Sequence, residues 1–206
     1  MDIDTLIIPI SYLGVLAGAV SGVFEARRKN MDVVGASVIA LITALGGGTL
    51  RDLMLGRTPV FWINEESFAI TAFVTAIITF YSSRLLILGA HSIAIPDALG
   101  LGVFSILGAA YSLDMGTSWF IASLMGVTTG VFGGVLRDII CNEIPMVFAR
   151  NAELYATCSF IGAWVYIILR TGGFHPSFAT LAGVSITVLL RLAALRYDLR
   201  LPEPHE

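Results

Sequence analysis

The stretch ALGGGTLRDLMLGRTPVFW, from Ala44 to Trp62, interrupts a long apolar run of the chain. Three consecutive glycines, Gly46–Gly48, are followed within four residues by the charged pair Arg51 and Asp52. A glycine inside a helix costs about 1 kcal/mol relative to alanine, and charged side chains are expensive inside a bilayer. A helix that carries both features at membrane depth predicts a functional site.

The composition predicts an integral membrane protein. Of 206 residues, 56% are hydrophobic and 13% are charged, whereas a soluble domain has about 25% charged residues. Seven apolar runs approach the ~20 residues that cross a bilayer as a helix. They are Thr5–Phe24, Met31–Leu55, Phe68–Leu88, Ser92–Leu113, Ser118–Cys141, Leu154–Leu169 and Pro176–Leu195. Because only short loops remain, we expect an all-α protein with one membrane domain over residues 1–206.

Several function classes have no support in the sequence. The formal net charge of −3 is spread thinly and indicates no nucleic-acid partner. Two cysteines and three histidines form no metal-ligand spacing. No nucleotide-binding, hydrolase or metalloprotease motif is present. We therefore expect neither an enzyme nor a metal site, and no cofactor.

The basic residues predict the orientation. With the N-terminus outside and the C-terminus cytoplasmic, eight of them fall on the cytoplasmic side and two outside, as the positive-inside rule requires. The cytoplasmic eight are Arg27, Arg28, Lys29, Arg84, Arg150, Arg191, Arg196 and Arg200, and the outer two are Arg57 and Arg170. The chain is therefore predicted to be multi-pass in the inner (plasma) membrane. The cluster Arg27–Lys29 could also contact anionic lipid headgroups.

The chain repeats itself at a constant offset of 86 residues. The matched pairs are Gly14–Gly100, Gly22–Gly108, Ala36–Ala122, Thr43–Thr129, Gly47–Gly133, Gly48–Gly134, Leu50–Leu136, Arg51–Arg137, Asp52–Asp138 and Pro59–Pro145. Repeat 1 then covers about residues 5–88 and repeat 2 about 91–170, while a last helix over about 176–195 is left over. Because each unit has three spans, the second enters the membrane from the opposite side. Such inverted repeats build many transporters and some channels, with the site where the two copies meet.

The glycines predict breaks in the second and fifth spans. Irregular backbone at membrane depth is tolerated where it is buried in protein or lines a water-filled cavity. The half-helices before the breaks would end in free carbonyls and a negative dipole end, which favour a cation. The predicted pathway residues are Gly46, Gly47, Gly48, Thr43, Thr49, Gly133, Gly134, Thr128 and Thr129. An alternative is that the glycines only let helices pack closely.

The two Arg-Asp pairs, Arg51-Asp52 and Arg137-Asp138, have more than one possible role. Neighbouring residues on a helix point about 100° apart, so we expect neither pair to bridge to itself. They could cross-link the repeats, line the mouths of the pathway or control gating, or simply hold the half-helices in place. Three other acidic groups near span ends are expected to be interfacial. These are Glu25, Asp97 and Asp114.

Helix packing is predicted from a second set of glycines. Gly14, Gly18 and Gly22 recur at every fourth position and form a flat face for close helix contact. The matching positions in the second repeat are Gly100, Phe104 and Gly108. The phenylalanine shows that the two halves are not identical, and it could narrow one side.

The motif GGGTLRDLMLGRTPVFW and its echo FGGVLRD resemble the bacterial relatives of the trimeric intracellular cation (TRIC) channels. The resemblance covers almost the whole chain and extends to membrane-protein relatives that share the GGGTxRD motif. It implies kinked second and fifth helices, a pore in each protomer of a homotrimer, and passive conduction of monovalent cations, chiefly K⁺ and possibly Na⁺. The family motif maps onto Gly46–Gly48, Arg51, Asp52, Gly133, Gly134, Arg137 and Asp138. In the second copy Phe132 replaces the first glycine of the motif, so the resemblance does not fix how far the fifth helix bends.

Two other functions remain open at this point. The same bacterial sequences are also associated with small amino-acid transport, especially of glycine. An inverted repeat with broken helices suits a secondary transporter as well as a fixed pore. A structural scaffold without conduction would explain the packing glycines but not the charges inside the spans.

Overall fold

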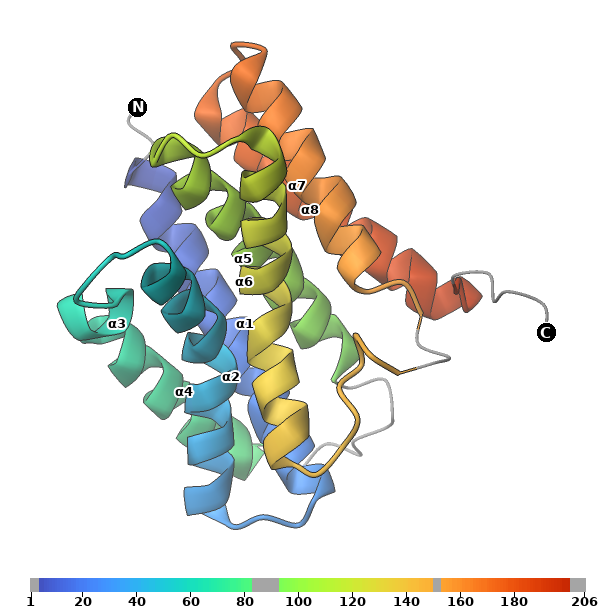
Figure 1. The fold of residues 1–206 in the computed structure, drawn as a ribbon. Coiled ribbons are helices and arrows are strands. Elements are labelled where there is room, and N and C mark those ends of the chain that lie inside the picture. The colour runs from blue at the N-terminus through green and yellow to red at the C-terminus, as the bar shows by residue number, and fades with distance from the viewer. Residues whose placement is uncertain (1–3, 83–92, 150–152, 201–206) are drawn as a thin grey trace.

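The structure is a computed structural model that describes residues 4–82, 93–149 and 153–200. Within these residues it contains helices and connecting loops (Figure 1). The helices are α1 (Asp4–Arg28), α2 (Val33–Met54), α3 (Phe61–Asn64), α4 (Ser67–Ser82), α5 (Ala94–Asp114), α6 (Trp119–Ile140), α7 (Ala156–Thr171) and α8 (Pro176–Tyr197). Each of the seven predicted runs therefore contains one long helix. The short α3 was not predicted. Some predicted positions lie outside the described residues, namely residues 83–88 of the third run, Ser92 at the start of the fourth, and the basic residues Arg84 and Arg150.

Five of these helices, α1, α2, α5, α6 and α8, are long and apolar enough to cross a membrane. α4 and α7 are apolar but have only 16 residues in their described parts, which is a rise of about 24 Å. The structure thus confirms an all-helical membrane protein but does not confirm seven spans.

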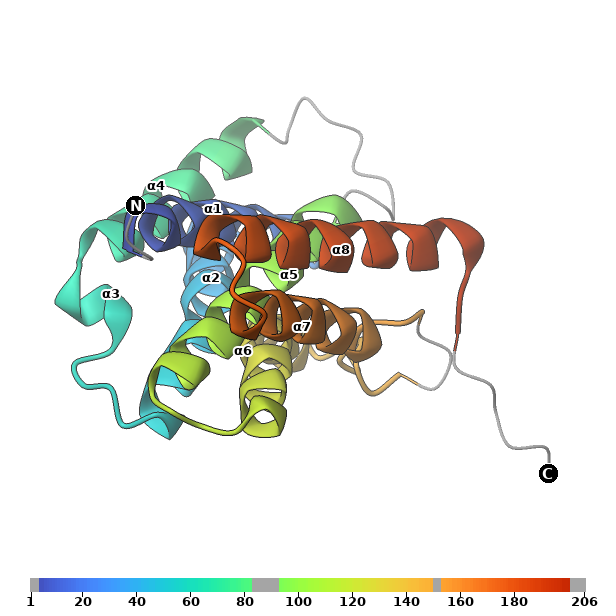
Figure 2. The same cartoon turned by 90° about the horizontal axis from the view of Figure 1, so that it is seen from above.

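The helices are arranged around α5. It packs against α1, α6, α7 and α8, and it has the largest buried share of the five candidate spans. Figure 2 shows α3 and α4 at one end of the molecule and α7 and α8 at the other, with α1, α2, α5 and α6 between them. This order places the two copies of the repeated motif, at the ends of α2 and α6, on helices that are in direct contact.

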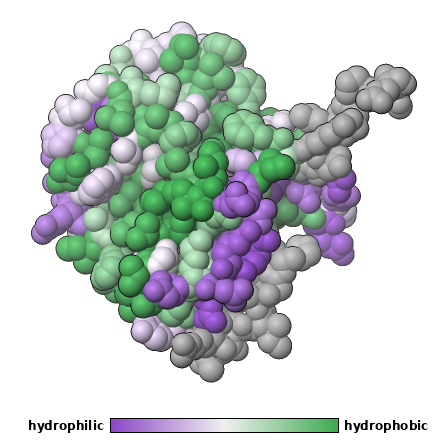
Figure 3. All heavy atoms as spheres, turned by 60° about the horizontal axis from the view of Figure 1, so that its bottom comes forward, coloured by the Kyte–Doolittle hydropathy of each residue, from purple (hydrophilic) through white to green (hydrophobic). Residues whose placement is uncertain are grey.

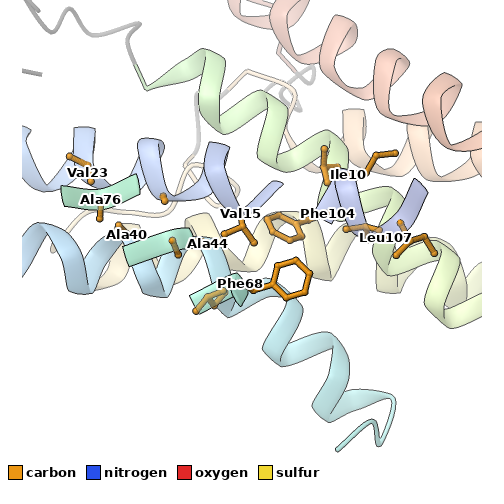
Figure 4. Close-up of a cluster of buried hydrophobic side chains, with 14 residues drawn as sticks. Ile10, Val15, Val23, Ala40, Ala44, Phe68, Ala76, Phe104 and Leu107 are labelled. Carbon is orange, nitrogen blue, oxygen red and sulfur yellow. The ribbon is translucent and has the colours of Figure 1, made fainter. Parts of the chain in front are cut away.

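The core of the first half combines large side chains with alanines. Figure 4 shows Val15, Phe104 and Phe68 among small residues such as Ala40 and Ala44. Inside a bilayer, packing rather than expulsion of water brings helices together, and small residues let the backbones approach closely.

The outer surface is apolar, as a membrane protein requires. Many large hydrophobic side chains are exposed, among them Val34, Ile78, Trp119 and Leu189. Figure 3 shows hydrophobic residues across most of the visible face, with hydrophilic ones gathered toward the end of the molecule that comes forward in that view. We infer that lipid covers the apolar surface.

The predicted helix breaks are not confirmed. α2 remains helical through Gly46–Gly48, and α6 remains helical through Gly133 and Gly134. The glycines are instead sites of close approach. A Cβ atom at Gly46 would lie 2.8 Å from Cδ1 of Leu136, and one at Gly48 would lie 2.5 Å from Cε1 of the Phe61 ring. On α1, a Cβ atom at Gly18 would likewise lie 2.9 Å from the Cα of Ala44, and one at Gly22 would lie 2.7 Å from the Cα of Ala40. Close packing, the alternative given above, therefore explains these glycines without any loss of helical structure.

Candidate functional site

The repeated motif folds in the same way twice. At the start of α2, Asp32 accepts a hydrogen bond from the Gly35 amide, and at the start of α6, Ser118 accepts one from the Ile121 amide. These side-chain caps satisfy backbone donors that the helix cannot. After each helix, the chain turns through a residue with positive φ, Gly56 in one copy and Asn142 in the other. The 86-residue offset is kept at the caps and at the turns.

Each Arg-Asp pair forms an internal salt bridge, so the expectation that the pairs would not bridge is wrong. Arg51 Nε donates to Asp52 Oδ1 at 2.9 Å, and Arg137 Nε donates to Asp138 Oδ1 at 2.8 Å. The long arginine chain folds back over the next residue, which overcomes the 100° separation. Both aspartates also accept a backbone N–H from the segment that follows: Asp52 from Phe61 at the start of α3, and Asp138 from Met146 in the loop after α6. Both pairs are almost completely buried.

α2 and α6 cross at reciprocal positions. A Cβ atom at Gly47 would clash with the carbonyl oxygen of Thr129, and one at Gly133 would clash with the carbonyl oxygen of Thr43. Gly47 corresponds to Gly133 and Thr43 to Thr129 at the 86-residue offset. Contacts in which i touches j′ and j touches i′ are the mark of a two-fold relation. The two repeats therefore meet at this crossing as equivalent partners.

A small central cavity lies beside this crossing. Its volume is about 20 Å³, which is space for about one water molecule. Its walls come from α1, α2, α5 and α6 and from Tyr155. They include Gly18, Ser21, Thr43, Gly47, Asp97, Gly100, Phe104, Thr129, Gly133 and Gly134. Five of the nine predicted pathway residues are thus brought together.

Thr43 and Thr129 both line the cavity, and each hydroxyl donates its proton within its own helix. Thr43 Oγ1 donates to the Ile39 carbonyl at 2.7 Å, and Thr129 Oγ1 donates to the Met125 carbonyl at 2.6 Å. A hydroxyl that has used its proton in this way still has lone pairs. Because these two threonines and the carboxylate residue Asp97 belong to its walls, the lining suits a positively charged guest better than a negatively charged one.

Arg137 joins three helices at one end of the cavity. Its Nη1 donates to Asp97 Oδ1 of α5 at 2.7 Å and to Ser21 Oγ of α1 at 2.6 Å. The Tyr155 hydroxyl is close by, because a Cβ atom at Gly134 would lie 3.2 Å from it and 3.7 Å from Asp97 Oδ1. Asp97 was expected at the membrane interface, but it is buried here. Asp97 lies inside a predicted span, Ser92–Leu113, and that position was the signal that could have identified it as a site residue.

Arg51 has different surroundings. Its guanidinium lies 4.2 Å from the ring centre of Tyr111 and 5.5 Å from that of Phe61. Arg57 lies 3.9 Å from the centre of the same Tyr111 ring. A cavity of about 390 Å³, which we call the Arg57 vestibule, is lined here by residues that include Ser11, Tyr12, Asp52, Arg57, Glu65 and Tyr111. Arg51 thus has aromatic rings as partners in addition to Asp52, whereas Arg137 has a second carboxylate, Asp97, in addition to Asp138.

The remaining predicted pathway residues lie elsewhere. Gly46 and Thr49 line an apolar groove of about 430 Å³ with Leu53, Trp62 and Phe132. There Thr49 Oγ1 accepts a hydrogen bond from Trp62 Nε1. A Cβ atom at Gly48 would meet the Phe61 ring, and Thr128 is half-buried and does not line the central cavity.

The second set of glycines packs helices in both repeats. Gly14 approaches Val103 and Phe104 of α5, while Gly108 approaches the Met125 carbonyl of α6. Gly100 differs, because the atom nearest to an added Cβ would be 3.9 Å away. That atom is the backbone nitrogen of Gly18, at an ordinary contact distance, and Gly100 lines the central cavity.

The basic cluster at the end of α1 has partners within the protein. Arg27 Nη1 donates to the Phe80 carbonyl, and Arg28 forms a two-bond pair with Glu25. Glu143 Oε1 accepts from Lys29 Nζ at 2.5 Å and from Arg28 Nη2 at 3.0 Å. The hydrogen bond from Lys29 lowers the pKa of Glu143 below its ordinary value. These contacts tie the loop after α6 to the end of α1.

Comparisons with known proteins agree over nearly the full length. The family model described as "Glycine transporter" matches residues 9–84 and 94–171. A UPF0126 membrane protein of Vibrio cholerae is 41% identical, covering 97% of this chain and 84% of that protein. The UPF0126 inner membrane protein YadS of Escherichia coli K12 is 37% identical, covering 94% and 93%. The crystal structure of the TRIC trimeric intracellular cation channel orthologue from Rhodobacter sphaeroides superimposes with a TM-score of 0.89 at 36% identity, covering 95% of this chain and all of that one.

Proposed function

This chain belongs to the membrane-protein family that unites the glycine-transporter model, the UPF0126 proteins and the bacterial TRIC channels, and from that premise we propose that it is a passive channel for monovalent cations, chiefly K⁺. The pathway runs inside each protomer of a homotrimer and passes through the central cavity. The protein carries out no enzymatic reaction and needs no cofactor.

The central cavity is the observation that carries this proposal. It lies where the two repeats cross, and its lining residues include Asp97 and two threonines whose hydroxyls keep free lone pairs. Such oxygens can replace part of the hydration shell of a cation. A volume of about 20 Å³ accepts one water-sized particle but not an ion with its water shell. In this account the structure is a non-conducting state, and conduction requires the helices to separate slightly.

The topology follows from the repeat. We propose seven spans, with α1, α2 and α4 forming one unit, α5, α6 and α7 the inverted second unit, and α8 the additional helix. The shorter α4 and α7 would cross as parts of longer segments or where the bilayer thins around them. The N-terminus lies outside and the C-terminus in the cytoplasm of the inner membrane. The reciprocal crossing of α2 and α6 supports the two-fold relation on which this topology depends.

A secondary transporter for glycine is the competing function. Glycine has five heavy atoms and would need a much larger opening of the central cavity than a bare K⁺ ion. Its carboxylate would also need positive partners, whereas Arg51 and Arg137 are already paired with aspartates. The cavity therefore supports the cation channel more strongly.

The first prediction compares the two substrates directly in liposomes that contain the purified protein. K⁺ should leave loaded liposomes down its gradient with no coupling ion, faster than from liposomes without protein. Uptake of labelled glycine should not exceed that of empty liposomes. Saturable glycine uptake that depends on Na⁺ or H⁺, with K⁺ efflux at the background rate, would establish the transporter instead. If both K⁺ efflux and glycine uptake stay at the rates of empty liposomes, the remaining function is that of a structural scaffold.

A further inference from the structure

Two buried guanidinium groups lie along the proposed cation pathway, and each would repel a cation by itself. Arg51 is neutralised by Asp52, and Arg137 is neutralised by Asp138. The two pairs alone leave the pathway without net charge. Any preference for one sign of ion beyond that of the neutral threonine hydroxyls must therefore come from another charged group.

Asp97 is the group that breaks this balance. Arg137 faces two carboxylates, Asp97 at 2.7 Å and Asp138 at 2.8 Å, so the cluster has one negative charge in excess. At the 86-residue offset the partner of Asp97 is Ser11. Ser11 Oγ donates to the Ile7 carbonyl, and among the described residues no carboxylate besides Asp52 pairs with Arg51. In the part of the chain that the structure describes, the excess charge at the cavity wall thus belongs to the Arg137 half of the molecule alone.

The other charged groups nearby do not cancel this excess. On the far side of Tyr155, Arg191 lies 4.8 Å from the ring centre and 3.9 Å from a Glu153 carboxylate oxygen. At the end of α1, Arg28 and Lys29 are paired with Glu25 and Glu143. Arg27 beside them donates to the Phe80 carbonyl and lies over the Phe80 ring. Ser21 and Tyr155, which lie beside Asp97, are neutral. In the Arg57 vestibule, Arg57 is accompanied by Glu65.

We propose that Asp97 is the side chain that makes the pathway select cations over anions. This inference rests on the proposed function, because it needs ions to pass the central cavity. Asp97 is 7% exposed, and a charge at such a site acts through low dielectric, where its influence on a passing ion is several times that in water. Arg137 holds the carboxylate in place at the cavity wall and does not neutralise the cluster.

The test uses reversal potentials in planar bilayers with a tenfold KCl gradient, where ideal K⁺ selectivity gives about 59 mV. Wild type should lie close to that value. Asp97→Asn keeps the size of the side chain and its acceptor for Arg137, but it removes the excess charge. Its K⁺-to-Cl⁻ permeability ratio should fall by about tenfold or more, and Asp97→Glu should keep the wild-type ratio.

A compensating variant uses the repeat. Adding Ser11→Asp to Asp97→Asn places a carboxylate at the equivalent point beside Arg51 and should restore part of the permeability ratio. Ser11→Asn in the same background adds the same bulk without charge and should restore nothing. Asp97→Ser, which gives position 97 the residue that the repeat carries at position 11, should lower the ratio as Asp97→Asn does and provides a second neutral variant if Asp97→Asn yields no folded channel.

The outcomes separate this inference from the proposed function. A reversal potential does not depend on the number of channels, so lower yield of a variant cannot imitate the effect. Wild-type reversal potential in Asp97→Asn would overturn the role of Asp97 while leaving the channel intact, as would wild-type reversal potential in Asp97→Ser. Absence of cation current in wild type would overturn the proposed function itself.

Discussion

Gly47→Ala is expected to prevent stable folding or to lower the free energy of unfolding by about 3 kcal/mol, at the upper end of the range for overpacked cores. The added methyl group would collide with the Thr129 carbonyl oxygen at the crossing of α2 and α6. A backbone oxygen cannot rotate away as the end of a side chain can. The helices must therefore move apart, and the reciprocal contact of Gly133 with Thr43 is lost with them. Thermal unfolding of the purified protein in detergent measures the loss.

Gly100→Ala is the matched control for this prediction. Gly100 lines the same cavity and corresponds to Gly14 in the repeat, but an added Cβ atom there meets nothing closer than 3.9 Å. The variant should unfold within a few degrees of wild type. Equal stability of Gly47→Ala and Gly100→Ala would show that the crossing of α2 and α6 is looser than described here.

Arg137→Ala is expected to cost about 3–5 kcal/mol of stability, as is typical when one member of a buried ion pair is removed. It leaves Asp97 and Asp138 buried without their cation and leaves Ser21 without its donor. Arg51→Ala should cost less. Only one carboxylate, Asp52, then loses its partner, and that group still accepts the Phe61 amide.

Thermal unfolding of both variants measures this difference, and a double variant identifies its cause. Arg137→Ala combined with Asp97→Asn should be more stable than Arg137→Ala alone, because one of the two unpaired charges is gone. If Arg51→Ala and Arg137→Ala unfold at the same temperature, the additional partner of Arg137 contributes nothing to stability.

Hydropathy and the internal repeat predicted much of the fold. Apolar runs located every long helix of the described chain, because a segment surrounded by lipid must satisfy its backbone within itself. The 86-residue offset paired Gly47 with Gly133 and Thr43 with Thr129, which the structure brings into reciprocal contact. The family resemblance was confirmed by the relatives and solved structures.

The site was harder to predict because it depends on which face of each helix turns inward. Thr43 and Thr49 both follow from the motif, yet one faces the central cavity and the other the apolar groove. Asp97 is distant in sequence from Arg137, and only the packing of α5 on α6 brings them together. The glycines suggested broken helices because glycine has a low helix propensity. The sequence did not show that neighbouring helices approach these positions so closely that no larger side chain would fit.

The most direct test of the central claim, that cations cross each protomer through the central cavity, compares Thr43→Cys with Thr49→Cys. Both threonines belong to α2, and both donate to the carbonyl four residues earlier. The background carries Cys141→Ala and Cys158→Ala, which remove the two native buried thiols. A positively charged thiol reagent applied during K⁺ current should abolish the current of Thr43→Cys and leave that of Thr49→Cys unchanged. Block of Thr49→Cys alone, or full current through Thr43→Cys after mass spectrometry shows complete modification, would place the pathway outside this cavity.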